Sequence, residues 1–158
     1  MSSKLFLPAK FKLAGWCILI PATIFGVILI SVGFEEIRVH AKVFAIFSDQ
    51  IFGESQSFSF IETNITNTVA GVLFILGAVF VGFSKEKRED EFIAKLRMSS
   101  LLWAVWVNYS LLLLSFLFVY GTAFLTVMLY NMFTVLIIFI VRFNYLLYKN
   151  SKMLSDEK

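Results

Sequence analysis

The fold is decided by one uncharged stretch, Met98 to Val141, which reads MSSLLWAVWVNYSLLLLSFLFVYGTAFLTVMLYNMFTVLIIFIV. A helix needs about 20 consecutive apolar residues to cross a lipid bilayer, and this stretch is long enough for two such helices. Gly121 can turn the backbone tightly because glycine has no side chain to clash. The stretch therefore predicts two membrane spans, residues 98–120 and 122–141, joined as a short antiparallel hairpin.

Two further apolar runs lie earlier in the chain, at residues 13–34 and 66–83. The first contains Pro21, which should kink a helix because proline has no amide hydrogen to donate. Hydrophobic residues make up 59% of the chain and its mean hydropathy is +0.83, whereas soluble domains average about 45–50% apolar residues. The sequence predicts one all-α integral membrane domain over residues 1–158, a four-helix transmembrane bundle whose solvent is the lipid bilayer.

Positive charge is unevenly distributed about the four spans. All but two of the 14 Lys and Arg residues lie before the first span, in residues 84–97, or from Arg142 onward. The other two, Arg38 and Lys42, lie in the segment 35–65. Because loops rich in Lys and Arg stay in the cytoplasm, both termini and residues 84–97 are predicted inside the cell, with 35–65 outside. Topology thus accounts for the net charge of +3, so we expect a multi-pass protein of the cell membrane without direct nucleic acid binding.

The connector between the second and third spans, SKEKREDEFIAKLR (residues 84–97), carries acidic residues that the orientation does not require. From Glu89 the connector is predicted to be a helix that continues into the third span, with Glu91 and Lys95 spaced as an i,i+4 ion pair. Two interpretations are open: a charged helix entry at the membrane interface, or a docking face for a cytoplasmic protein. The docking face would consist of Glu89, Asp90, Glu91, Phe92 and Lys95.

The outer segment, residues 35–65, is apolar but also carries acidic residues. Apolar side chains alternate as in a strand from Ile37 to Val43, yet others from Ile37 to Ile51 fit one stripe of a helix. Periodicity alone does not decide between these structures. In either structure, an apolar face beside the membrane should pack on the bilayer or cap the bundle, and binding of an external molecule is the alternative.

Uncharged polar residues interrupt the third and fourth spans. Folding the hairpin about Gly121 places Asn108 level with Thr134, and an amide within lipid needs a hydrogen-bond partner. We predict one interhelical polar cluster, formed by Asn108, Tyr109, Asn131 and Thr134. The cluster is either a structural contact between helices or a ligand or ion site. The second possibility supports a competing function, a small oligomeric transporter or channel component.

Residues with catalytic or metal-binding chemistry are sparse. No Asp or Glu lies within the four spans, which argues against proton-coupled transport. Cys17 is the only cysteine and His40 the only histidine, so no Cys/His metal set can be built. We therefore expect no metal, no cofactor and no enzymatic activity.

Three stretches carry a resemblance to a known family: FSKEKREDEFIAKLR (83–97), WAVWVNYSLLLL (103–114) and YNMFTVLIIFIVRFNYLLYKNSK (130–152). In them the chain resembles an uncharacterised family of small four-helix bacterial integral membrane proteins, often encoded beside a small helix-turn-helix regulator. The resemblance implies an inner-membrane protein that holds or senses for such a regulator, and it implies no catalytic residue. The leading expectation is a non-enzymatic membrane interaction protein.

Overall fold

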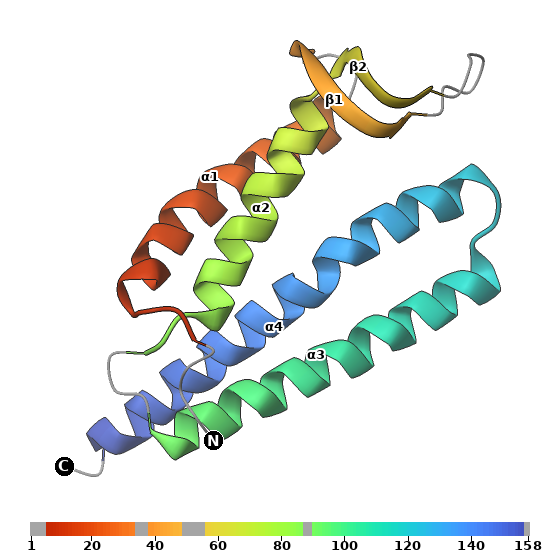
Figure 1. Ribbon diagram of the computed structural model, residues 1–158. Coiled ribbons are helices and arrows are strands. Elements are labelled where there is room, and N and C mark those ends of the chain that lie inside the picture. The colour runs from red at the N-terminus through yellow and green to blue at the C-terminus, as the bar shows by residue number, and fades with distance from the viewer. Residues whose placement is uncertain (1–5, 34–37, 49–55, 87–89, 157–158) are drawn as a thin grey trace. The chain divides into compact units, whose positions relative to one another are not determined.

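A computed structural model describes residues 6–33, 38–48, 56–86 and 90–156 of the protein (Figure 1). The elements follow one another as α1 (Lys10–Val32), β1 (His40–Ser48), β2 (Gln56–Asn64), α2 (Thr66–Phe83), α3 (Glu91–Phe118) and α4 (Thr122–Asp156). The chain divides into two compact units. Unit 1 comprises Met1–Leu19 and Ile75–Lys158, and unit 2 is Ile20–Phe74. Each unit is described by itself.

Within the described part of the chain, four helices are long and apolar enough to cross a membrane, as the sequence predicts. Helices α1 and α4 extend beyond the predicted spans: α1 begins at Lys10 rather than residue 13, and α4 continues to Asp156 rather than ending at residue 141. Helix α3 begins at Glu91, within the connector, where the sequence predicted a helix that continues into the third span. The predicted limits followed charged residues, but a helix needs only its backbone hydrogen bonds to continue into water. These apolar helices are compatible with a multi-pass membrane protein, and the described part of the chain is mostly helical.

The core of unit 1 lies where α2, α3 and α4 meet. Phe139 and Phe143 of α4 are fully buried, and Ala78 of α2 and Ala104 of α3 are buried as well. Gly82 of α2 lets Phe139 approach, because a Cβ atom there would lie 2.6 Å from the Phe139 ring. Small residues thus allow a large aromatic ring to fill the space between helices.

The connection between α3 and α4 is short, as predicted. Helix α3 ends at Phe118, and Val119 donates its backbone N–H to the Ser115 carbonyl at 2.9 Å. Gly121 adopts a φ of 70°, a left-handed conformation that glycine reaches without strain. The chain then enters α4 at Thr122.

Unit 2 contains a β-hairpin, so the all-α prediction was incomplete. Strands β1 and β2 pair antiparallel, with Val43 opposite Ile61 and Phe44 opposite Phe60. Lys42 lies opposite Glu62, an opposite-charge pair of the kind that stabilises antiparallel strands. Of the two patterns seen in the sequence, the strand alternation predicted up to Val43 is therefore correct over residues 40–43, where it overlaps β1, and the helical stripe is not. Ile37, where both patterns begin, lies outside the described residues.

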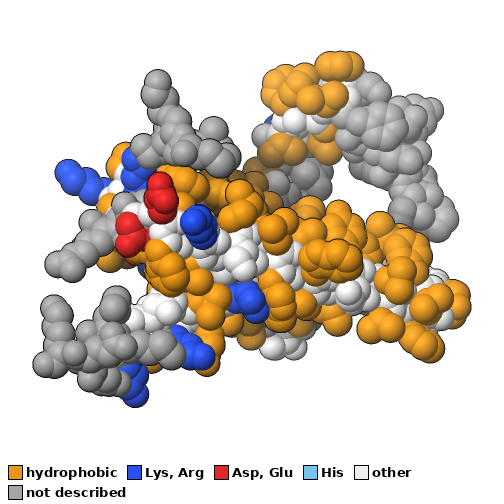
Figure 2. Space-filling view, turned by 90° about the horizontal axis from the view of Figure 1, so that it is seen from below, with side chains coloured by type: hydrophobic (Ala, Val, Ile, Leu, Met, Phe, Trp, Pro, Cys, Tyr) orange, Lys and Arg blue, Asp and Glu red, His pale blue; other side chains and the backbone are white. Residues whose placement is uncertain are grey.

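Apolar side chains are the most widespread kind of side chain on the face drawn in Figure 2, and the Lys and Arg side chains seen there lie mostly on its left side. Many large apolar residues of the helices are exposed, among them Leu113, Phe118 and Leu125. A soluble protein rarely exposes so continuous an apolar surface. This surface is expected for helices that pack against lipid.

Candidate functional site

The N-terminal segment pairs with the end of α2, a contact that sequence reasoning missed. Leu7 donates its N–H to the Phe83 carbonyl at 3.1 Å and accepts from the Lys85 N–H at 2.8 Å. Leu7 and Ser84 thereby form a parallel β-bridge. The start of the charged connector is thus held by backbone hydrogen bonds to a segment more than 70 residues away in sequence.

Arg97 lies at the centre of this arrangement and is only 3% exposed. Its Nη2 donates to the Ser84 carbonyl at 3.0 Å. Its guanidinium lies 4.4 Å from the centroid of the Phe6 ring and 5.1 Å from that of the Phe143 ring. We call the set Phe6, Leu7, Ser84, Arg97 and Phe143 the connector junction. A buried charge requires such partners, because desolvating a lone guanidinium is costly.

An ion pair also links helix α1 to the charged connector. Lys12 of α1 donates to the Glu86 carboxylate, and both side chains are partly buried. Ser84 and Ser100 are fully buried and donate their hydroxyls to carbonyls of their own helical turns, those of Phe80 and Leu96. The hydroxyl groups of these two buried serines are therefore paired within the protein.

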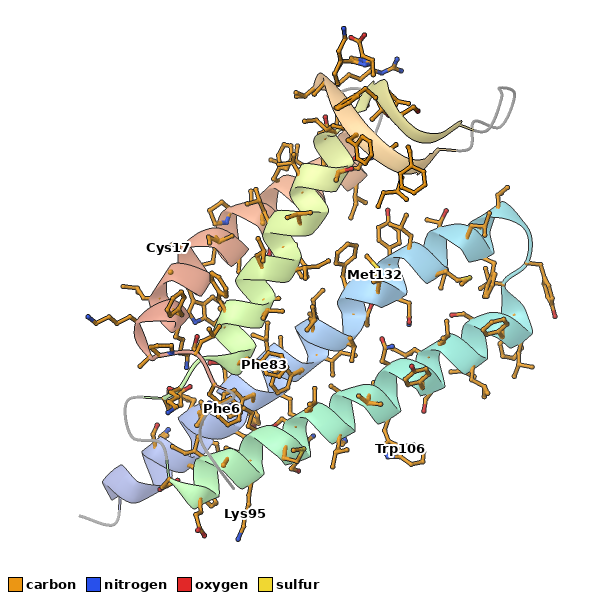
Figure 3. All side chains as sticks on the ribbon, in the orientation of Figure 1. Phe6, Cys17, Phe83, Lys95, Trp106 and Met132 are labelled. Carbon is orange, nitrogen blue, oxygen red and sulfur yellow. The ribbon has the colours of Figure 1, made fainter. Side chains whose placement is uncertain are left out.

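The predicted docking residues lie on the outer side of the junction. Asp90 caps α3, and its carboxylate accepts the Ile93 N–H at 2.8 Å. Glu91 and Lys95 are exposed, and Phe92 is 54% exposed. Figure 3 shows Lys95 pointing away from the neighbouring helices, as Trp106 does further along α3. Glu89 lies outside the described residues.

The predicted polar cluster is reduced to two asparagines. Asn108 Nδ2 donates to Asn131 Oδ1 at 3.1 Å, and Asn131 Nδ2 donates to Asn108 Oδ1 at 3.2 Å. Tyr109 is 64% exposed and lies outside this pair. Thr134 donates its hydroxyl to the Tyr130 carbonyl of its own helix at 3.0 Å. Each amide thus satisfies the other, as a polar group within lipid requires.

The offset of the asparagine pair has a simple cause. The prediction assumed that Gly121 alone makes the turn, which placed Asn108 opposite Thr134. The connection instead takes the three residues from Val119 to Gly121, between Phe118 and Thr122. The centre of the hairpin therefore moves toward Tyr120, and Asn108 meets Asn131, almost one helical turn before Thr134.

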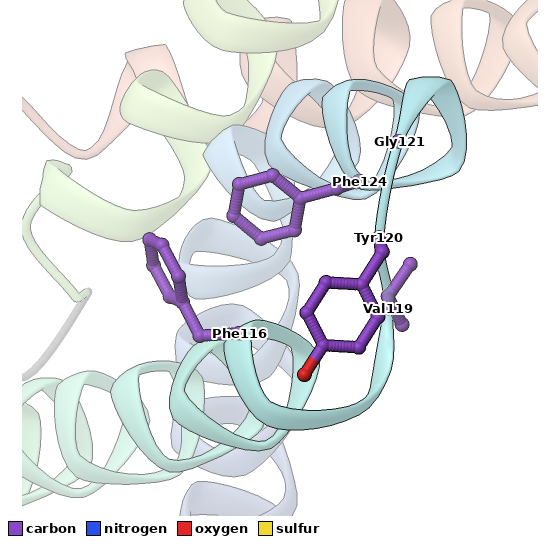
Figure 4. A pocket seen from close by; sticks show the side chains of 5 residues that line it. All are labelled: Phe116, Val119, Tyr120, Gly121 and Phe124. Atoms are coloured by element: carbon purple, nitrogen blue, oxygen red, sulfur yellow. The ribbon is translucent and has the colours of Figure 1, made fainter.

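A hollow of about 200 Å³ lies at the α3–α4 turn (Figure 4). Its lining is Phe116, Val119, Tyr120, Gly121 and Phe124. The Tyr120 hydroxyl donates to the Leu117 carbonyl at 2.8 Å, and the other lining side chains are apolar. A lining with so few polar groups offers little to orient a specific polar ligand.

Arg142 of α4 lies beside Trp103 of α3. Its guanidinium lies 4.2 Å from the centroid of the Trp103 ring, and α4 continues for several turns beyond it. Among the described residues, its buried Nε has no hydrogen-bond partner. The ring face compensates the charge, and the pairing links α3 to α4.

The described residues contain no group of three or more His, Cys, Asp or Glu side chains that could hold a metal ion. The arrangement instead offers a fixed junction with a charged, partly aromatic outer face. No family model, curated protein or solved structure matches the chain.

Proposed function

We propose that the chain is a non-enzymatic integral membrane protein that binds a soluble cytoplasmic protein through the outer face of its charged connector. The binding face is Asp90, Glu91, Phe92 and Lys95, with Glu89 beside them in sequence. The partner is a protein with basic side chains that meet the acidic residues, and the sequence resemblance favours a transcriptional regulator. The membrane is the bacterial inner membrane, and both termini lie in the cytoplasm.

The observation that carries the proposal is the exposure of Phe92. Its side chain is 54% exposed between the exposed charges of Glu91 and Lys95. An aromatic residue among charges is a favourable anchor for a protein interface, since it supplies contact area while the charges set specificity. Lipid is a weaker explanation at this position, because the neighbouring charges prefer water.

The junction supports the proposal by fixing the base of the connector. Arg97 is about 1.4 helical turns from Phe92. Its guanidinium donates to the Ser84 carbonyl and lies 5.1 Å from the centroid of the Phe143 ring. A binding face on a fixed element loses less conformational entropy on association than a face on a mobile loop. Asp90 also stabilises the start of α3, because its carboxylate caps the helix.

The test is photo-crosslinking in cells from position 92. A photo-reactive residue replaces Phe92, and the matched control replaces Trp106, which is 75% exposed on the apolar part of α3. We expect position 92 to capture one soluble protein and position 106 to capture lipid. Mass spectrometry of the crosslinked species identifies both.

A charge-swapped variant makes this test specific. The double change Glu91→Lys with Lys95→Glu keeps the net charge, leaves the Asp90 cap in place and retains an i,i+4 ion pair. It reverses only the charge pattern beside Phe92. Loss of the captured protein in this variant supports docking. Unchanged capture, or capture of lipid alone from position 92, contradicts it.

A further inference from the structure

The β-hairpin carries its large apolar side chains on its exposed face. Phe44 and Ile46 of β1 and Phe58 and Phe60 of β2 are between 54% and 77% exposed. The Phe44 ring lies 5.4 Å from the Phe60 ring and 6.5 Å from the Phe58 ring, centroid to centroid. We call these four residues the aromatic face. On a hairpin surrounded by water, this face would be expected to carry polar residues.

On the same face of each strand, the residues nearest α2 are polar, and we call this end the base of the hairpin. Lys42 is paired with Glu62, and His40 is paired with Asn64 next to the start of α2. The aromatic face lies further along both strands. The hairpin is therefore amphipathic along its length, with a polar base and an apolar outer part.

The base of the hairpin is fastened to the first turn of α2. Ile65 donates its N–H to the Val39 carbonyl at 2.9 Å, and Val39 donates its own N–H to the Thr66 hydroxyl at 3.0 Å. The Asn64 side chain accepts the Thr66 N–H at 3.0 Å. Only Ile65 separates β2 from α2. The depth of the hairpin in or above the membrane is thus set by where α2 begins.

The length of α2 places that beginning at the membrane surface. With 18 residues, the helix is about 27 Å long, which is no longer than the roughly 30 Å hydrocarbon core of a bilayer. Thr66 therefore lies at the boundary between hydrocarbon and headgroups. The base of the hairpin lies in the headgroup region.

The direction of the strands decides what surrounds the aromatic face. Phe60 is six residues from Thr66, about 20 Å of extended chain, whereas each headgroup layer is only about 5–7 Å thick. An upright hairpin would hold the face in water, and a hairpin lying on the surface holds it among lipids. Figure 1 shows both strands turning away from the axis of α2 rather than continuing along it.

Phe58 provides an independent indication that this face has an occupant. Its φ of 55° is a left-handed conformation that is rare and strained for an aromatic residue. The strain persists although the side chain is largely exposed. Strained residues of this kind cluster at functional sites, among them surfaces that hold a ligand.

We propose that the aromatic face binds the lipid interface of the membrane at its own end of α2, with the hairpin lying along the bilayer surface. Phe44, Ile46, Phe58 and Phe60 insert between the headgroups, and the Lys42–Glu62 pair stays in water. The occupant is lipid because the base of the hairpin is held at headgroup depth and the face itself carries no charge to select a protein.

Spin-label accessibility tests the proposal on the full chain in liposomes of phosphatidylethanolamine and phosphatidylglycerol. The label is placed by Phe60→Cys, with Glu62→Cys as the matched control two residues away on the same strand face. Both are built on Cys17→Ser, because Cys17 is exposed and would also be labelled. Collision with oxygen, which concentrates in lipid, is compared with collision with a water-soluble nickel chelate.

We expect a higher oxygen-to-nickel collision ratio at position 60 than at position 62. Equal, water-like ratios at the two positions would overturn the proposal. Low access to both reagents at position 60 would also overturn it, because a protein surface would then cover the face. Dipolar broadening at position 60 that disappears on dilution with unlabelled protein would instead assign the face to a second copy.

A second variant keeps the test valid if Phe60→Cys fails to insert. Phe58→Asn keeps a residue that tolerates the left-handed backbone and removes one aromatic ring from the face. Labelled at position 46 by Ile46→Cys, this variant should show a lower oxygen-to-nickel ratio than the same label on the unchanged face. No change in that ratio would contradict insertion of Phe58.

Discussion

The two ends of helix α2 are stabilised in opposite ways. At Phe83 the chain enters the connector junction, where Arg97 is buried between aromatic rings and the backbone pairs with Leu7. At Thr66 the chain meets the hairpin, whose base is hydrogen-bonded but whose aromatic rings lie on the outside. At the Phe83 end the key side chains are buried within the protein. At the Thr66 end the aromatic side chains of the hairpin are exposed to the surroundings. Changes at the junction should therefore alter stability, and changes to the aromatic face should alter lipid contact.

The largest effect on stability is expected at Arg97. Arg97→Ala removes the hydrogen bond to Ser84 and empties a large buried site, which should lower the free energy of unfolding by about 3 kcal/mol. Arg97→Lys keeps the charge but loses the planar stacking, so its loss should be smaller. Titration with sodium dodecyl sulfate, followed by circular dichroism, measures both. Lys95→Ala, an exposed change on the same helix, is the control, and an equal loss in that variant would contradict the special role of Arg97.

Close helix contact at Gly77 should give the next largest effect. A Cβ atom at this position would lie 2.8 Å from the Leu19 backbone nitrogen and 2.9 Å from its Cα, both in unit 1. Gly77→Ala must therefore separate α1 from α2, at a cost of about 2 kcal/mol. The matched control is Gly26→Ala, because nothing lies within 4 Å of a Cβ atom there. If the same titration shows equal losses for both variants, close packing at Gly77 is not the cause.

Substitutions of Asp90 distinguish its role in capping α3 from a role in docking a protein. Asp90→Ala should destabilise the start of α3 by about 1 kcal/mol, because the Ile93 N–H loses its acceptor. Asp90→Ser keeps a capping oxygen and removes only the charge. Hydrogen exchange at Ile93 should accelerate in the alanine variant and stay near the parent rate in the serine variant. Equal acceleration in both would show that charge, rather than the cap, protects this amide.

The smallest effect is expected at the asparagine pair. Interhelical hydrogen bonds within membranes contribute about 0.6 kcal/mol on average, so Asn108→Leu and Asn131→Leu should each have a modest cost. The double variant should cost less than the two single variants together, because no amide is then left unpaired. A double-mutant cycle measures this coupling. Strict additivity would mean that the two amides do not depend on each other in the membrane.

Much of the fold could be predicted because lipid imposes a strong pattern on sequence. The four spans required long uncharged runs, and Gly121 marked the turn between the last two. Other helix ends could not be predicted as well as the start of α3 in the connector, since α1 and α4 continue past the residues that bounded the predicted spans. The hairpin remained ambiguous because strand and helix patterns overlap between Ile37 and Ile51, and only pairing with Gln56–Asn64 decides between them.

The candidate site was less predictable because its contacts join distant segments. Nothing local in the sequence indicates that Leu7 pairs with Ser84, or that Phe6 and Phe143 both approach Arg97. One usable signal was the position of Arg97 next to an apolar run, where a lone charge needs partners. A hydrogen bond between Asn108 and a polar residue of α4 was predictable, since each amide needs a partner in lipid. Its register was not, because the turn takes three residues rather than one.

The side of the membrane on which the connector lies is the most direct test of docking to a cytoplasmic protein. In a Cys17→Ser background, single cysteines at Glu91, Ser151 and Lys42 are exposed to a membrane-impermeant maleimide, first in intact cells and then after permeabilisation. For the proposed location in a bacterial inner membrane, we predict that Lys42→Cys is labelled in intact cells whose outer membrane has been opened. Glu91→Cys and Ser151→Cys should be labelled only when the inner membrane is permeabilised. Labelling of Glu91→Cys in intact cells would place the connector outside and contradict docking of a cytoplasmic protein.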